Sequence, residues 1–595
     1  MSAPSDQGSP KGTDAGSEIW TLLIAALGVA AVWYLAFTAK DPLFLAPFRE
    51  AQTAISADWL LREPTGGMLA YQTPVLGAPW RLPLEFPIFQ QTAAWIASIG
   101  VPIVLSGRLI SLFCWLCCLV VLFKLLPLWG FPRSRLPAVV ALSAVAPLHS
   151  AYSASYLIES MALLAALVHL WAFWRCAQGA GPVWWMTALL SGIAVALIKI
   201  TTWVSPGALT GILTLKLFWD VRRSPRPSSA LLLCAGLAAL GITCLASGLL
   251  WSKWAAGVRN LNPFAMVLFS SDEQRTWIFG NLHDRLSLRL NILLAVKHLM
   301  LLFGPLGVAV PWILARALIW PASDRRLQAA VVIPLGAYLV HAVLLFPLHL
   351  RHDYYLLGSG IFLSASVAAA VASAQARSPG RLWVRWAAPA LAVSMVLGGL
   401  VHVTLRKGYR DLAVDAAIRA VGAVKDPGAL LTFGFDWSSK IPFTVGRKAL
   451  MVPDSVPSAP AVARLASAVT LNKSTAFAAA LVMAPQWGDH AAAAAAQLGL
   501  DPQKRYPFWE GAYLILRTNS QPTFNLSDSG APELAALGLR TVPSTVGAGL
   551  VFSRWPGSGR PGDGFEIVVR RDNDAFWVRS SGRQLIRVRN YFQSH

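Results

Sequence analysis

Acidic and basic side chains interleaved with aromatic rings mark residues 48–90, which follow the first long apolar run of the chain. A carboxylate can take a proton from a hydroxyl group, and a guanidinium can hold an anionic oxygen with paired hydrogen bonds. The segment therefore predicts a polar cavity at the membrane boundary, where chemistry on an anionic lipid becomes possible. Its side chains with catalytic or binding potential are Arg49, Glu50, Gln52, Arg81 and Glu85.

A second set of ionisable side chains lies within apolar segments or at their ends. Charged groups are costly in lipid, so each of them is a candidate functional residue. Glu159 comes early in one apolar segment, and Lys199 ends another in the run LIKITTW. The run LHLRHDYYLLG places Arg351, His352 and Tyr354 at the start of a further segment. With the carboxylates of residues 48–90, these groups are expected at one membrane face.

Each of these residues also has a purely structural interpretation. Lys199 can extend its ammonium group to the membrane interface without any further role. Glu159 can pair with a neighbouring helix, and Arg351 can form a simple ion pair with Asp353. These interpretations explain the residues one at a time but not their expected convergence on one face.

The histidines and cysteines give no specific metal signal. His341 and His349, taken together with a glutamate, do not match a tight ligand spacing. Cys114 and Cys117 have C-x-x-C spacing but lie inside an apolar segment, where small apolar packing is the better interpretation. The sequence therefore assigns no metal ligand and no certain cofactor, and it leaves a divalent metal open.

The composition indicates a protein that crosses a membrane several times. Of its 595 residues, 55% are hydrophobic and only 13% are charged, and the mean hydropathy is +0.53. A soluble protein carries roughly twice that charged fraction. The net charge of +21 does not indicate a nucleic-acid partner, because the basic residues are spread over the gaps between apolar segments.

Apolar segments of roughly 17–27 residues predict about eleven transmembrane helices. Lys and Arg gather in alternate connections, such as residues 222–226 and 377–385, which places the N-terminus in the cytoplasm and the C-terminus outside. The predicted spans are approximately residues 18–38, 108–127, 136–153, 157–177, 183–201, 203–219, 228–250, 290–316, 328–348, 353–375 and 383–405.

The expected fold class is a polytopic α-helical membrane protein with a C-terminal extracytoplasmic α/β domain. The tail mixes strand-like runs, such as residues 429–435, with alanine-rich helical runs, such as residues 461–469. The expected parts are a disordered cytoplasmic N-terminus at 1–17, a transmembrane domain at 18–405 with outer loops 39–107 and 251–289, and the tail domain at 406–595.

The order of several motifs resembles the GT-C superfamily of integral-membrane glycosyltransferases. Its members include the protein O-mannosyltransferases, the aminoarabinose transferase of lipid A and the RgtA/B/C/D-like group. The family's acidic motif after the first span corresponds to FREAQTA, followed by PWRLPLEFPIFQ and then Gly107-Arg108-Leu109. Glu159 matches a second acidic residue, and His352-Asp353-Tyr354-Tyr355 matches an H-x-Y-Y-like element. The resemblance covers about residues 18–405 and implies a GT-C-like fold.

The resemblance implies an enzyme of the inner (plasma) membrane that transfers a sugar from a polyprenyl-phosphate donor to a glycan, lipid or protein acceptor on the outer face. The family commonly has Asp or Asp-Glu where this chain has Arg49-Glu50, so the base stays open between Glu50 and Glu85. The catalytic candidates are Glu50, Glu85 and Glu159. The candidates for binding substrate are Arg49, Gln52, Arg81, Lys199, Arg351, His352 and Tyr354.

Other classes of membrane protein remain as alternatives. A flippase or transporter for a lipid-linked glycan needs no catalytic carboxylate and often shows internal repeats, of which this sequence has no obvious example. An O-antigen polymerase or ligase is also polytopic, but it usually lacks a separate folded tail of this kind. A structural scaffold would leave the ionisable residues without a role.

Overall fold

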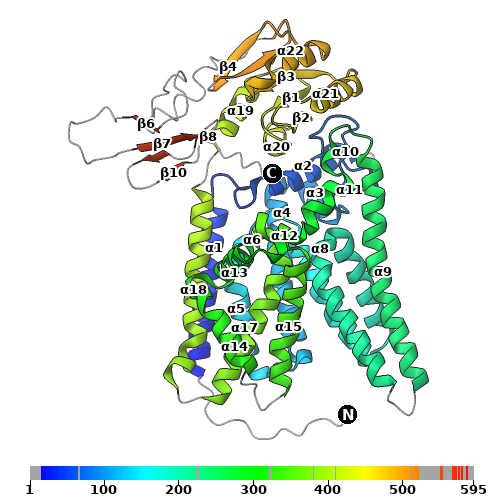
Figure 1. Ribbon diagram of the computed structural model, residues 1–595, viewed down its shortest axis with the longest axis vertical. Helices are drawn as coiled ribbons and strands as arrows, with labels where there is room; N and C mark the ends of the chain where they lie inside the picture. Colours follow the sequence, from blue (N-terminus) through cyan, green and yellow to red (C-terminus); the bar gives the residue numbers. More distant parts are fainter. Residues whose placement is uncertain are drawn as a thin grey trace, which may run out of the picture. The chain divides into compact units, whose positions relative to one another are not determined.

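The protein folds into two compact units, as its computed structural model shows (Figure 1). The membrane unit comprises residues 1–42, 108–251 and 275–403, and the loop–tail unit comprises residues 43–107, 252–274 and 404–595. Residues 1–14 of the expected disordered N-terminus lie outside the described residues. The structure describes residues 15–64, 68–222, 227–319, 325–378, 381–408, 411–509 and 511–520, and the short strands between residues 550 and 586.

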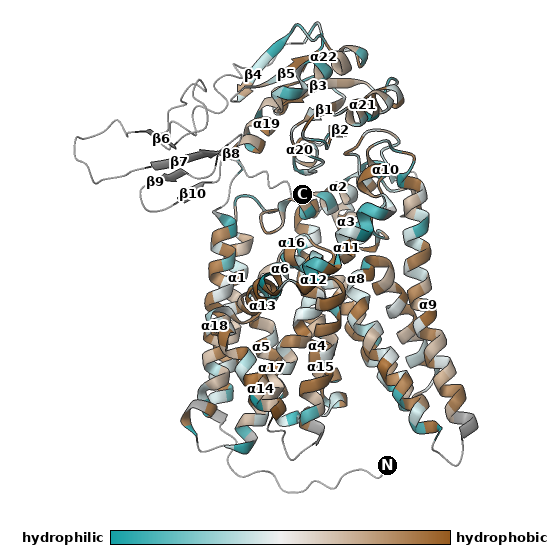
Figure 2. Ribbon diagram, viewed as in Figure 1, coloured by the Kyte–Doolittle hydropathy of each residue, from teal (hydrophilic) through white to brown (hydrophobic). Residues whose placement is uncertain are grey.

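The membrane unit is built from long apolar helices, along which Figure 2 shows mainly hydrophobic residues. Nine helices in the described part of the chain are long and apolar enough to cross a membrane. The prediction of a multi-pass helical membrane protein is therefore confirmed. These helices are α1 (Ala15–Phe37), α4 (Ile103–Leu125), α7 (Glu159–Ala177), α8 (Pro182–Val221), α9 (Pro227–Arg259), α13 (Leu288–Phe303) continuing into α14 (Val310–Ile319), α15 (Arg325–Leu344), α17 (Leu357–Arg377) and α18 (Leu382–Lys407).

Two regions differ from the predicted spans. The segment predicted at 136–153 forms two short helices, α5 (Leu136–Val145) and α6 (Pro147–Tyr152), because Pro147 has no N–H to continue the first helix. The spans predicted at 183–201 and 203–219 form α8, whose two helical halves meet at Lys199. Lys199 has non-helical angles, with φ −160° and ψ 92°. A kink with an extended residue turns that side chain away from the regular helix surface.

Arg108, from the Gly107-Arg108-Leu109 motif, ties three segments of the membrane unit together. It is buried, and its guanidinium donates to the carbonyl oxygens of Ala154 at 2.6 Å and Ala36 at 2.9 Å. The same group lies 4.3 Å from the centre of the Phe37 ring. A cation is favourable at the end of α1, where helix carbonyls lack partners. Arg108 thus fixes the segment that leads into α7 and Glu159.

The tail contains a five-stranded mixed sheet. Its strands are β1 (Ala429–Phe433), β2 (Ala449–Val452), β3 (Phe477–Val482), β4 (Arg505–Trp509) and β5 (Ala512–Leu516), in the order β2-β1-β3-β5-β4. β2 and β3 pair with β1 in parallel, whereas β5 and β4 are antiparallel. All residues of β1, β2 and β3 are buried, which is typical of parallel strands covered on both faces. The α/β prediction for the tail is confirmed.

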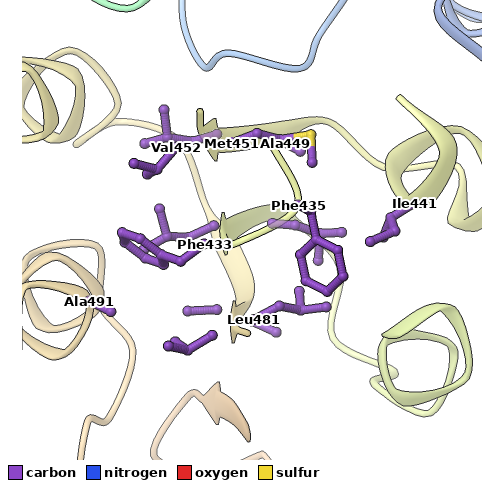
Figure 3. Packing of buried hydrophobic residues seen from close by; sticks show 14 of the residues in the cluster. Phe433, Phe435, Ile441, Ala449, Met451, Val452, Leu481 and Ala491 are labelled. Atoms are coloured by element: carbon purple, nitrogen blue, oxygen red, sulfur yellow. The ribbon is translucent and has the colours of Figure 1, made fainter. Parts of the chain in front are cut away.

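Helices supply the layers that cover this sheet. They are α19 (Leu412–Gly422), α20 (Lys440–Val445), α21 (Ala459–Leu471) and α22 (Gly488–Gln497). Figure 3 shows Phe433, Met451 and Leu481 of the three parallel strands packed between Ile441 of α20 and Ala491 of α22. Further strands follow at β6 (Leu550–Ser553), β7 (Glu566–Arg571), β8 (Asp574–Ala575), β9 (Val578–Ser580) and β10 (Gln584–Ile586).

The first loop adds a short extended segment to the edge of the tail sheet. Leu76 forms an antiparallel bridge with Leu450 of β2. The Ala449 N–H donates to the Pro74 carbonyl at 2.9 Å, and the Met451 N–H donates to the Val75 carbonyl at 3.0 Å. Backbone bonds therefore join loop and tail into one unit. The loop also contributes the helices α2 (Pro47–Arg62) and α3 (Ile88–Ser98), and α10 (Ala265–Leu268) belongs to the same unit.

Candidate active site

Glu50 lies in the first turn of α2 and is fully buried. Pro47 begins the helix, a position where its missing N–H costs nothing. The Ala46 N–H donates to Oε2 of Glu50 at 2.9 Å. A carboxylate is favourable here because it meets unpaired N–H groups at the positive end of the helix.

Arg49 connects two other candidate residues of the first loop, Glu85 and Gln52. Its Nη2 donates to Oε2 of Glu85 at 2.9 Å, and its Nη1 donates to Oε1 of Gln52 at 2.6 Å. The second oxygen of Glu85 accepts a 2.7 Å hydrogen bond from Gln90 at the start of α3. Gln90 was not predicted from the sequence, although it lies only five residues after Glu85, in the first turn of α3. Both carboxylate oxygens of Glu85 are thus engaged by side-chain donors.

Tyr71 and Arg81, which also belong to the first loop, form hydrogen bonds with backbone atoms of that loop. The Tyr71 hydroxyl donates to the Glu85 carbonyl at 2.7 Å and accepts from the Leu84 N–H at 2.9 Å. Burial raises the pKa of Tyr71, so it remains a neutral donor. Arg81 donates to the Leu69 carbonyl oxygen at 2.7 Å, so its hydrogen bond goes to the backbone and not to a catalytic candidate.

In the membrane unit, Glu159 and Lys199 form a buried ion pair. Nζ of Lys199 lies 2.6 Å from Oε1 of Glu159, the first residue of α7. The same ammonium lies 4.4 Å from the centre of the Tyr355 ring and 5.2 Å from that of Tyr354. Two aromatic faces and one carboxylate therefore surround the Lys199 charge. Tyr355 follows the predicted Tyr354 in sequence but was not itself predicted as a site residue. The 3₁₀ turn at Asp353–Leu356 brings its ring, like that of Tyr354, close to the Lys199 ammonium.

Arg351 and His352 continue this aromatic group. The exposed Arg351 guanidinium lies 4.1 Å from the centre of the Trp277 ring, which belongs to α11 (Ser271–Phe279). The His352 ring stacks on Tyr354, with 5.1 Å between centres and 17° between planes. Burial lowers the pKa of His352 to about 4. The Asp353 carboxylate opposes this shift, and the cations Lys297, Arg351 and Lys199 add to it. His352 is therefore a neutral imidazole at pH 7, while Arg351 carries the charge.

Buried histidines lie next to this element without forming a metal centre. His341 and His349 share a 2.8 Å hydrogen bond, and His298 shares one of 2.6 Å with the Tyr338 hydroxyl. Across the described ranges of the chain, there is no group of three or more His, Cys, Asp or Glu side chains that could hold a metal ion. The six cysteines are free thiols in or beside the helices.

Asp436 lies three residues after the end of β1 and was not among the candidate residues predicted from the sequence. Asp436 is half-buried and has a positive φ of 52°. Burial raises its pKa to about 6; the Trp437 N–H opposes this and the nearby Asp454 adds to it. The next ring, Trp437, packs between Phe48 at 4.9 Å and Phe269 at 5.5 Å. A non-glycine residue with positive φ is uncommon, and no pattern in the sequence predicted this one.

No family model and no curated protein sequence matches this chain. Solved structures do share its fold. ArnT from Cupriavidus metallidurans bound to undecaprenyl phosphate has a TM-score of 0.54 at 14% identity, over 84% of this chain and 98% of that one. The apo form of the same ArnT has a TM-score of 0.52 at 13% identity, with the same coverage. The apo oligosaccharyltransferase of Archaeoglobus fulgidus has a TM-score of 0.49 at 11% identity, over 79% of this chain and 70% of that one.

The two ArnT comparisons show the fold of this chain: over 84% of its length it shares the overall arrangement of those structures. The resemblance seen in the sequence motifs is thereby confirmed at the level of the fold.

Proposed function

We propose that this protein is a membrane glycosyltransferase that transfers a sugar from a polyprenyl-phosphate donor to a hydroxyl group of a glycan, lipid or protein acceptor. The GT-C fold supports the class of reaction, and the bound undecaprenyl phosphate of the ArnT structure supports the donor class. The observation that carries the proposal is the buried carboxylate of Glu50 next in sequence to Arg49, which pairs with the buried Glu85, because ionisable groups in such surroundings cluster at functional sites.

The reaction requires one carboxylate to act as the base. The acceptor oxygen attacks the anomeric carbon of the donor sugar, the bond from that carbon to the phosphate oxygen breaks, and the carboxylate takes the acceptor proton. We assign the base to Glu50. Both oxygens of Glu85 are already bound by the side chains of Arg49 and Gln90. Glu50 is closed to solvent here, so acceptor binding has to shift the side chains that cover it.

The leaving polyprenyl phosphate requires a cation. We assign this role to Arg351, which is exposed and has the planar donor geometry that matches a phosphate. His352 serves as a neutral hydrogen-bonding partner. The buried Lys199 is already paired with Glu159, so its main role is to hold the Tyr354–Tyr355 turn in place. By the distribution of Lys and Arg, transfer takes place on the outer face of the membrane.

The decisive experiment is a profile of envelope glycans and lipids from cells with and without the gene. A sugar-bearing product should disappear in the deletion strain and return with the wild-type gene. It should not return with Glu50→Gln, whereas Glu273→Gln, which changes an exposed glutamate of the same unit, should restore it fully. Identical profiles with and without the gene would reject the transferase proposal and favour a structural or transport role.

A further inference from the structure

The loop–tail unit contains a cavity of about 440 Å³ whose role the proposed reaction does not explain. One wall is Trp59, near the C-terminal end of α2. The other walls are residues 427–429, 445–448 and 475–476, which lead into β1, β2 and β3 respectively. Ligand pockets in proteins commonly measure roughly 300–1,000 Å³, so the space suits a small ligand.

The polar side chains that line this cavity are hydrogen-bond donors. They are the Trp59 indole, the Arg447 guanidinium, the Lys448 ammonium and the Thr475 hydroxyl, and no carboxylate is among the lining residues. Nη2 of Arg447 donates to the Val424 carbonyl at 2.6 Å, which anchors the guanidinium. Within the described residues, Nη1 of Arg447 and Nε1 of Trp59 are buried and have no hydrogen-bond partner. Such groups are rare in native structures and need an explanation.

Lys448 and the indole ring form a second part of the same surface. Nζ of Lys448 lies 4.6 Å from the centre of the Trp59 ring and 5.8 Å from that of Trp80. It also lies 3.1 Å from Oε2 of Glu63, which keeps the ammonium at the cavity rim. An aromatic wall beside two cations is suited to a ring that bears a negative charge.

We propose that this cavity binds an acidic saccharide unit, whose carboxylate lies between Arg447 and Lys448 and whose ring lies against Trp59. A small turn of the indole and the guanidinium into the cavity would give both unpartnered N–H groups an oxygen acceptor. A lipid phosphate would supply the same oxygens without a ring, so the aromatic wall favours a sugar. The ligand class is therefore a uronic-acid-containing glycan.

The position of the cavity gives it a role in the proposed transfer reaction, on which this step of the argument rests. Glu50 and Trp59 lie on the same helix, nine residues apart, which corresponds to about 14 Å along the helix axis. Nine residues also correspond to about two and a half helical turns, so the two side chains leave opposite faces of α2. A glycan chain that starts at the acceptor hydroxyl near Glu50 would therefore have to pass around α2 to place a further unit in the cavity. The cavity would then select acidic acceptors at a distance from the bond that forms.

Direct binding tests the site without any donor or turnover. Full-length protein in phosphatidylcholine nanodiscs is titrated by calorimetry with trigalacturonic acid and with neutral maltotriose. The acidic trisaccharide should bind at least tenfold more tightly. Arg447→Gln and Trp59→Leu should each weaken it at least tenfold, whereas Arg505→Gln, which changes an exposed arginine on the edge strand β4, should leave it unchanged.

Several outcomes would overturn the site. These are equal binding of both trisaccharides, acidic binding that the cavity variants do not change, and tighter capture of soluble short-chain phosphatidylglycerol than of the acidic sugar. If Arg447→Gln unfolds, Lys448→Gln replaces it, because that change leaves the Arg447 anchor intact. The cell profile described above is a separate readout, so selective binding with no glycan change would reject the transferase proposal and keep the site.

Discussion

Lys199 and Glu159 form their 2.6 Å ion pair from two different kinds of position. Glu159 begins α7, where a carboxylate meets the free N–H groups of the first turn. Lys199 interrupts α8 with an extended backbone. The helix break and the ion pair occur at the same residue, so the pair fixes the point at which the two halves of α8 meet.

Breaking this pair from one side should destabilise the protein. Lys199→Met leaves the Glu159 carboxylate buried without its cation, and Glu159→Gln leaves the ammonium without its anion. Loss of one partner of a buried pair typically costs about 3–5 kcal/mol, whereas an uncharged pair of similar size restores much of it. Thermal unfolding in detergent should therefore show lower Tm values for both single variants and a clear recovery in the double variant. Additive losses in the double variant would show that the two charges are not coupled.

Glutamine at position 50 should abolish transfer without unfolding the protein. Its side-chain oxygen can still accept the Ala46 N–H, so the helix start is kept while the proton acceptor is lost. The initial rate in membranes should fall by about 10²–10⁴. Glu85→Gln should lose less, because its expected effect is to release Arg49. Full activity of Glu50→Gln would move the base to Glu85 or Glu159.

Arg351 should determine the affinity for the lipid donor. Arg351→Lys keeps the charge but loses the two-pronged contact, so the KM for the donor should rise several-fold, and Arg351→Ala should raise it further. His352→Ala should have a smaller effect, because this imidazole is neutral at pH 7. Arg381→Ala, at an exposed arginine of the same unit, is the matched control. If the rate and the donor KM stay unchanged in both the Arg351 and His352 variants, this element is structural.

Asp436 should make the tail less stable as the pH rises. Its pKa is about 6 in the folded protein, above its ordinary value of 3.8, so the folded state holds a proton that the unfolded state has lost between these values. Its contribution to stability therefore falls from about pH 4 to pH 6 and stays low above that range. Asp436→Asn removes the charge and suits a positive φ, so it should stabilise the protein by on the order of 2 kcal/mol at pH 7.5 and much less at pH 4.5.

The control for this change is Asp489→Asn, which alters an exposed carboxylate of the same tail. Unfolding curves of the purified full-length protein at both pH values provide the measurement. An equal effect of Asp436→Asn at pH 4.5 and 7.5 would mean that the Asp436 carboxylate does not titrate in this window.

The orientation in the membrane is open to a direct test with reporter fusions. The Lys and Arg distribution places the connection at 220–227 in the cytoplasm and the tail outside. A fusion after residue 225 should therefore give an active cytoplasmic reporter, and one after residue 420 should be active only outside the cytoplasm. The reverse result at position 420 would remove the basis for outer-face chemistry.

Hydrophobicity and length were enough to predict most of the helices, because a bilayer imposes both on the local sequence. The predicted helix boundaries that were wrong depend on single residues. Pro147 divides one expected span into α5 and α6, and the two spans expected around Lys199 form the two halves of α8, which meet at the extended backbone of that residue. A hydropathy pattern averages over such points and therefore does not register them.

The candidate residues were recognisable by type but not by partner. The sequence suggested that Glu159 could pair with a neighbouring helix, and the structure identifies Lys199 as that partner. The Arg49–Glu85 contact joins residues separated by 36 positions, and neither local spacing nor periodicity encodes such a distance. The partial burial of Asp436 could not be predicted for the same reason, because it results from the packing of the tail and not from the neighbours of Asp436 in sequence.

The bridge between the first loop and the tail has a consequence for how the protein is made. Asn472 accepts a hydrogen bond from the Ala78 N–H across a separation of 394 residues, and β2 provides the partner for the loop segment around Leu76. A ribosome that adds roughly 5–20 residues per second needs roughly 20–80 s to cover that stretch. During that time the loop with Arg49 and Glu50 has been inserted but lacks its sheet partner. The nascent chain therefore cannot complete the loop–tail unit that contains its candidate base until synthesis has passed Asn472 of the 595 residues.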